Sequence, residues 1–130
     1  MIVLDTNAVL RFLLCDNVEK ATFVRDTMEQ EVCLVPTEVL AEAVYVLAKS
    51  YEIERPVIQQ TLLDFLQDEN VETPDLGVIE TALRYFGETK FDFVDCLMIG
   101  YAVIEGHRIL TFDKKLNKVL SSLTGETLFP

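Results

Sequence analysis

Four acidic residues adjoin or interrupt runs of apolar residues that are typical of a protein core: Asp5, Glu42, Asp95 and Asp113. Ionised carboxylates are rarely buried without a partner, because removing their charge from water is costly. Too few basic residues lie beside these four acids to neutralise all of them. A divalent cation is the simplest shared partner, and a cation held by carboxylates is typical of phosphate chemistry.

The elements that must position these acids alternate between strands and helices. The residue pattern predicts strands at 2–4, 32–35, 71–73 and 108–111, a further edge strand at 127–129, and helices at 7–14, 18–29, 38–49, 55–66, 77–86, 93–105 and 114–120. Thr37 and Asp92 are expected to cap the helices that follow them, and Gly106 to end the second of these. Such alternation predicts an α/β fold with a mostly parallel twisted sheet and helices on both faces, formed by residues 1–130 as a single domain.

Asp5 and Asp113 each follow a predicted strand. Ligands of parallel sheets bind outside the carboxyl ends of the strands, so both carboxylates are expected at that edge. Asp5 also precedes a predicted helix, and its alternative role is that of an ordinary helix cap. Asn7 and Thr111 lie beside these acids and are candidate supporting groups that orient a carboxylate or a water; local capping bonds are their alternative role.

Glu42 and Asp95 lie on predicted helices. At about 100° per residue, Glu42 falls at the edge of an apolar arc, where it can face a cleft or remain a solvated flank residue. Asp95 lies on the helix 93–105, which is apolar almost all round and therefore predicted to be buried. An acid there needs a partner, although the positive end of the helix dipole is an alternative one.

The chain has 130 residues, half of them hydrophobic and a quarter charged, which is typical of a globular protein. The apolar run Cys96–Ile104 is far shorter than the roughly 20 residues that cross a bilayer. Asp5 interrupts any signal-peptide core, and no basic segment precedes it. We therefore expect a cytoplasmic protein with no membrane span.

Three cysteines, Cys15, Cys33 and Cys96, show no CxxC spacing and lie in apolar surroundings. We expect all three to be buried, reduced thiols. With His107 as the one histidine, a zinc site or a Ser-His-Asp triad is hard to build.

The net charge of −11 opposes general coating of nucleic acid, which requires basic residues. It leaves room for an enzyme that holds nucleic acid through a metal ion and a local basic patch. Candidate phosphate contacts are Arg11 and the cluster Lys114, Lys115 and Lys118, which follows Asp113 directly. Lysines on a short helix also commonly form a solvated face.

Four stretches, at residues 2–7, 38–47, 91–98 and 109–115, together resemble the PIN domain, in particular the ribonuclease toxins of VapBC-type toxin–antitoxin pairs. The resemblance implies a three-layer α/β sandwich and places the family's acids at Asp5, Glu42, Asp95 and Asp113. It further implies an endoribonuclease dependent on Mg²⁺ or Mn²⁺, a homodimer, and a small antitoxin that covers the active site.

The hypothesis is metal-assisted hydrolysis of RNA phosphodiester bonds, which leaves a 5′-phosphate and a 3′-hydroxyl. One alternative is a nuclease that acts on DNA or structured nucleic acid; another is a non-catalytic PIN-like binding module whose acids are structural. A small phosphatase is disfavoured, because Asp5-Thr6-Asn7 lacks the second aspartate that would serve as its general acid.

Overall fold

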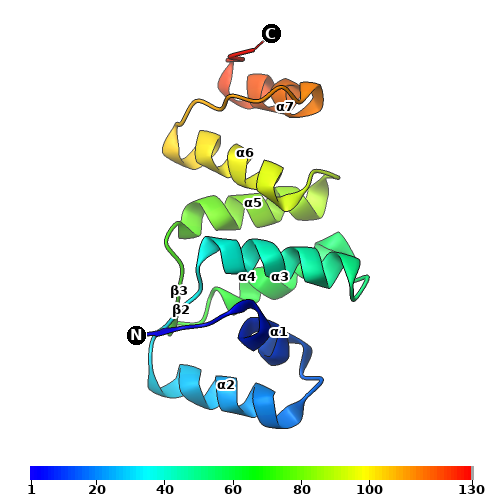
Figure 1. Cartoon of the computed structure of the whole chain (residues 1–130). Coiled ribbons are helices and arrows are strands. Elements are labelled where there is room, and N and C mark those ends of the chain that lie inside the picture. The colour runs from blue at the N-terminus through cyan, green and yellow to red at the C-terminus, as the bar shows by residue number, and fades with distance from the viewer. Residues whose placement is uncertain (130) are drawn as a thin grey trace. The chain divides into compact units, whose positions relative to one another are not determined.

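The computed structural model describes residues 1–129, which divide after Leu76 into two compact units. The first unit contains β1 (Ile2–Val3), α1 (Thr6–Leu14), α2 (Val18–Gln30), β2 (Cys33–Leu34), α3 (Thr37–Lys49), α4 (Arg55–Phe65) and β3 (Val71–Glu72). The second contains α5 (Leu76–Glu88), which begins at the division, α6 (Phe93–Glu105) and α7 (Lys114–Thr124) (Figure 1). The predicted helices are confirmed, with their ends moved by a few residues.

The strands of the first unit form a parallel sheet in the order β1-β2-β3. Ile2 lies opposite Cys33, and Cys33 opposite Val71. Backbone bonds extend the pairing by one residue, since the Leu4 amide donates to the Leu34 carbonyl at 2.9 Å. Three of the predicted strands are therefore confirmed and are parallel, as expected when helical connections join them.

Helix starts in the first unit follow the side-chain capping rule at α1 and α2, but not at α3 or α4. Side-chain oxygens of Asp5 and Asn17 accept bonds from backbone amides in the first turns of α1 and α2. The prediction that Thr37 caps α3 is wrong: Pro36 takes the cap position and Thr37 is the first helical residue. Proline in extended conformation suits that place, because it has no amide hydrogen to satisfy.

The first unit buries one face of α3 and keeps α1 in contact with both α2 and α3. The buried face of α3 consists of Leu40, Ala43, Val44 and Leu47. These positions recur at helical spacing, which explains why an apolar period of 3.6 residues predicted this helix.

The core of the second unit joins α6 to α7. Ile99 and Ala102 of α6 are buried with Leu116 and Leu120 of α7. At Gly100, a Cβ atom would lie 2.6 Å from the carbonyl oxygen of Val78, so α5 and α6 approach too closely there for any larger residue. Gly106 ends α6 with a φ of 68°, a conformation that favours glycine.

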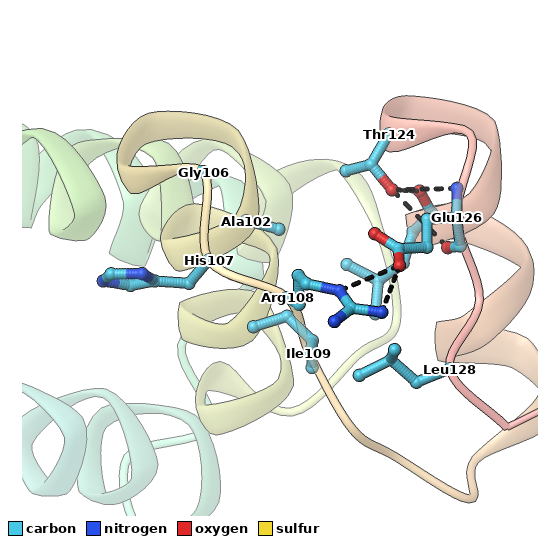
Figure 2. A pocket seen from close by; sticks show the side chains of 9 residues that line it. Ala102, Gly106, His107, Arg108, Ile109, Thr124, Glu126 and Leu128 are labelled. Carbon is cyan, nitrogen blue, oxygen red and sulfur yellow. Dashed lines mark hydrogen bonds and ion pairs between the residues drawn. The ribbon is translucent and has the colours of Figure 1, made fainter.

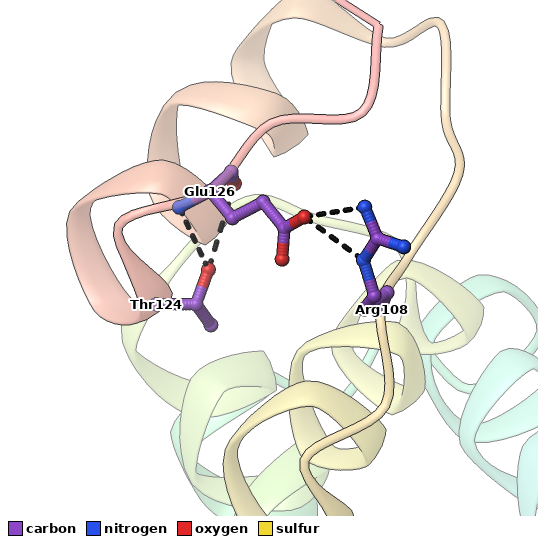
Figure 3. A network of polar contacts seen from close by, with 3 residues as sticks. All are labelled: Arg108, Thr124 and Glu126. Atoms are coloured by element: carbon purple, nitrogen blue, oxygen red, sulfur yellow. Dashed lines mark hydrogen bonds and ion pairs between the residues drawn. The ribbon is translucent and has the colours of Figure 1, made fainter.

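The predicted strands at 108–111 and 127–129 are wrong, because neither segment forms a strand. A strand needs a neighbour for its backbone groups, and the described part of the second unit contains no strand to supply one. Side-chain contacts hold these segments instead. Arg108 Nε and Nη2 donate to Glu126 Oε1 at 2.8 and 2.6 Å, and Thr124 caps the turn that carries Glu126 (Figure 3).

Two of the three cysteines are buried as predicted. Cys33 is fully buried in β2, and burial raises the pKa of its thiol above the usual range. Cys96 is buried on α6. The prediction is wrong for Cys15, which is exposed at the position that ends α1 in the left-handed conformation.

Candidate active site

Asp5 follows β1 and the buried Leu4, as the sequence predicted. It is exposed, and its Oδ1 accepts a hydrogen bond from the Ala8 amide at 2.8 Å. Asp5 is thus both a strand-end acid and the cap of α1. The capping bond fixes the direction of the carboxylate at the point where the chain leaves the sheet.

Glu42 is exposed on α3, beside the buried Ala43 and Val44. This exposure fits both predicted places for Glu42, at a cleft or on a solvated flank, so its role stays a prediction. Asn7, the candidate supporting residue in the first turn of α1, is exposed as well.

Asp95 lies in the first turn of α6 and is partly buried. Burial raises the pKa of its carboxyl group above the usual range, and the negative charges of Asp113 and then Asp92 raise this pKa further. Two carboxylates of the second unit thus oppose the ionisation of a third. A cation nearby would reverse this effect, because it favours the charged form.

Asp113 occupies the cap position of α7, and its Oδ1 accepts from the Leu116 amide at 2.9 Å. Because residues 108–111 form no strand, the prediction that Asp113 follows a strand end is wrong. Thr111 makes the local bond that was its alternative role, since its hydroxyl oxygen accepts from the backbone amide of Asp113 at 3.1 Å. Asp92 stands at the cap position of α6 as predicted, but its side chain makes no capping bond.

The four candidate acids divide evenly between the units, with Asp5 and Glu42 in the first and Asp95 and Asp113 in the second. Within each unit's described residues, no three acidic, cysteine or histidine side chains form a group that could hold a metal ion. The grouping that the structure does show is electrostatic, between Asp95 and Asp113. The complete four-acid cluster stays a prediction.

Two basic candidates differ in their surroundings. Arg11 forms an ion pair with Asp16 at 2.9 Å and donates to the Tyr51 hydroxyl at 3.0 Å, so its guanidinium group is engaged inside the first unit. Lys114 and Lys118 line a hollow of the second unit. The lysines are therefore better placed than Arg11 to contact a phosphate.

Sequence reasoning missed a pocket of about 220 Å³ between the end of α6 and the C-terminal segment (Figure 2). Its lining includes His107, Arg108, Thr124 and Glu126, and none of the predicted acids. Arg108 and Glu126, which both line this pocket, form an ion pair (Figure 2). A single pair of charges 18 residues apart has no periodicity or motif that could have signalled this contact.

Comparison with known proteins settles the family. The PIN domain model matches residues 2–120 and so runs through both units. This chain belongs to the PIN-domain family. Among curated PIN-like relatives, the VapC ribonuclease of Aquifex aeolicus (strain VF5) is 31% identical over 125 residues, which cover 92% of each chain. No solved structure matches this PIN-domain chain.

Membership of the PIN family and the parallel sheet together confirm the predicted α/β fold class. No helix among residues 1–129 of this PIN-domain protein is both long enough and apolar enough to span a membrane.

Proposed function

We propose that this PIN-domain protein is an endoribonuclease and the toxin of a type II toxin–antitoxin pair. The observation that carries the proposal is the likeness to a VapC ribonuclease over 92% of both chains. Residues 1–130 act as one nuclease domain in this proposal, since the family match continues through both units.

The cofactor is Mg²⁺ or Mn²⁺, held by Asp5, Glu42, Asp95 and Asp113. The chemistry of the donors fits such an ion, because hard divalent cations prefer carboxylate oxygens. The raised pKa of Asp95 also fits, since its causes are burial and two like charges that a cation would offset. When bound, the ion supplies Lewis-acid stabilisation of the charge that develops on the phosphodiester oxygens.

The residues of this chain have different roles at the proposed metal site. Capping bonds to Ala8 and Leu116 anchor the carboxylates of Asp5 and Asp113, which reduces the conformational entropy lost on binding. Thr111 holds the backbone at Asp113 through its hydroxyl oxygen. Asn7, exposed beside Asp5, is proposed as a supporting residue near the substrate.

The test compares cleavage of single-stranded RNA by wild type and by Asp95→Asn, with Mg²⁺, with Mn²⁺ and with a chelator. We expect Asp95→Asn and the chelator each to reduce the rate by at least about 100-fold, because metal ligands act as a unit. The matched control is Asp26→Asn, which changes an exposed acid on α2 and should cleave like wild type.

End-group analysis and a DNA substrate separate the alternatives. RNA products that carry a 5′-phosphate and a 3′-hydroxyl support the proposal, whereas products that end in a cyclic phosphate would contradict it. Preferential cleavage of DNA would reassign the substrate. Equal cleavage by wild type and Asp95→Asn, with or without chelator, would indicate a contaminating nuclease and overturn the assignment of the site.

The partners proposed are an RNA substrate, a cognate antitoxin and a second copy of the chain, in the cytoplasm. The antitoxin should abolish RNA cleavage at one equivalent per active site, and sedimentation of the purified protein should give the mass of a dimer. A sedimentation result at the monomer mass would remove the homodimer from the proposal and leave the ribonuclease untouched.

A further inference from the structure

The second unit has an aromatic and basic hollow beside Asp113, of about 460 Å³, which we call the α7 hollow. Its lining includes Phe112, Lys114, Asn117, Lys118 and Phe129. The rings of Phe112 and Phe129 meet edge to face with their centroids 4.9 Å apart. Phe112 is 71% exposed and Phe129 52% exposed, so this ring pair presents apolar surface to solvent.

A buried amide holds the two rings in place. Asn117 of α7 is 9% exposed, and its Nδ2 donates to the carbonyl oxygens of Thr111 at 2.9 Å and Phe129 at 3.3 Å. These carbonyls belong to the two segments that carry the rings. Since one side chain ties both segments to α7, the α7 hollow is formed before any ligand arrives, which lowers the entropy lost on binding.

The lysines at the α7 hollow are positively charged, whereas the chain as a whole carries a net negative charge. Lys114 and Lys118 line the hollow, and with the neighbouring Lys115 they are three of the eleven basic residues in a chain of net charge −11. Lys114 and Lys115 open α7, whose first turn contains no acidic residue. Cations at a helix N-terminus work against the helix dipole, so helix stability does not account for these lysines.

We infer that the α7 hollow binds one single-stranded nucleotide of the RNA substrate, with the base on the Phe112–Phe129 pair and its phosphate near Lys114 and Lys118. Aromatic platforms combined with lysines are the usual means of binding single strands, since every base has a face that stacks. Phe112 precedes the candidate catalytic residue Asp113 directly. The inference rests on the proposed function, and it assigns a substrate subsite beside Asp113.

The experiment measures binding of a short single-stranded RNA that contains 2-aminopurine, in chelator, so that cleavage plays no part. Stacking on a ring quenches this base. We expect Phe112→Leu and Phe129→Leu to weaken binding about 10-fold each and to reduce the quenching. The pair Lys114→Gln and Lys118→Gln should weaken binding and flatten its salt dependence.

Matched controls come from α2 in the first unit. Phe23→Leu replaces a phenylalanine that is 75% exposed, and Lys20→Gln replaces an exposed lysine. Both should bind the RNA like wild type. Circular dichroism and thermal melts of all variants show whether the fold is kept, and an unfolded leucine variant is replaced by Phe112→Met, for which the same loss is expected.

The outcomes separate this inference from the proposed function. Quenching that is lost in the leucine variants supports the α7 hollow even where wild type cleaves no RNA with Mg²⁺. Wild-type cleavage together with unchanged RNA binding in all hollow variants would overturn the inference alone. Hollow variants that lose affinity for the antitoxin but bind RNA like wild type would also overturn the inference. They would indicate that the α7 hollow contacts the antitoxin.

Discussion

Asp95 is the residue whose surroundings say most about the site. Its carboxyl group is partly buried, and this burial and the negative charges of Asp113 and Asp92 raise its pKa. A raised pKa means that the folded chain keeps this proton to a higher pH than the unfolded chain does. In the absence of metal, this residue therefore reduces stability as the pH rises from the unfolded value of roughly 4 through the folded pKa.

Asp95→Asn should then be at least as stable as wild type at neutral pH without metal, because the amide carries no charge to bury. At a pH below roughly 4 the difference should vanish, since the wild-type carboxyl is protonated in both states. Denaturant unfolding in chelator across this pH range measures both effects, with Asp26→Asn as the control. A variant that is less stable than wild type at neutral pH would show that the Asp95 carboxylate contributes favourable contacts instead.

At the scale of elements, the helix pair α5 and α6 depends on Gly100. A Cβ atom there would lie 2.6 Å from the Val78 carbonyl oxygen and 3.0 Å from Val78 Cγ1. Alanine gains up to about 1 kcal/mol of helix propensity over glycine, but overpacking against a backbone costs about 1–3 kcal/mol. Because the carbonyl oxygen can move only with its helix, we expect Gly100→Ala to destabilise the protein.

Gly77→Ala is the matched control for Gly100→Ala in thermal melts. Its Cβ would meet only Ile104 Cγ2, at 3.3 Å, and a side-chain methyl group can move aside. We expect this variant to unfold near the wild-type temperature. If Gly100→Ala unfolds there too, the helices can separate without loss, and the close approach is not needed for stability.

The same scale shows what sequence can and cannot predict. The helices followed from apolar spacing and caps, both local properties; Gly106 marked the end of α6 correctly. The segment 108–111 has strand-like residues, yet a strand depends on a neighbour that local pattern does not specify. Asn117 was missed for a related reason, since its partners lie 6 and 12 residues away and its amide resembles any helical surface residue.

Part of the candidate site could be predicted as well. The apolar surroundings of Asp95 predicted an acid in need of a partner, and its raised pKa agrees. The capping roles of Asp5 and Asp113 were harder to foresee, because aspartate favours both caps and metal ions and the residue type does not separate the two. The α7 hollow could not be predicted from local pattern, since it joins Phe112 to a ring 17 positions later.

On the scale of the whole molecule, the proposed cation should stabilise the folded chain as any specifically bound ligand does. A ligand that binds only the folded chain stabilises it by about 2.7 kcal/mol at a concentration 100-fold above its Kd. Mg²⁺ should therefore raise the melting temperature of wild type, and Glu42→Gln should reduce the increase. Glu38→Gln is the matched control, because Glu38 is also an exposed glutamate on α3, one turn earlier. If Mg²⁺ raises the melting temperature of both variants equally, Glu42 is not part of the metal site. If only Glu38→Gln shows a smaller increase, Glu38 and not Glu42 holds the metal.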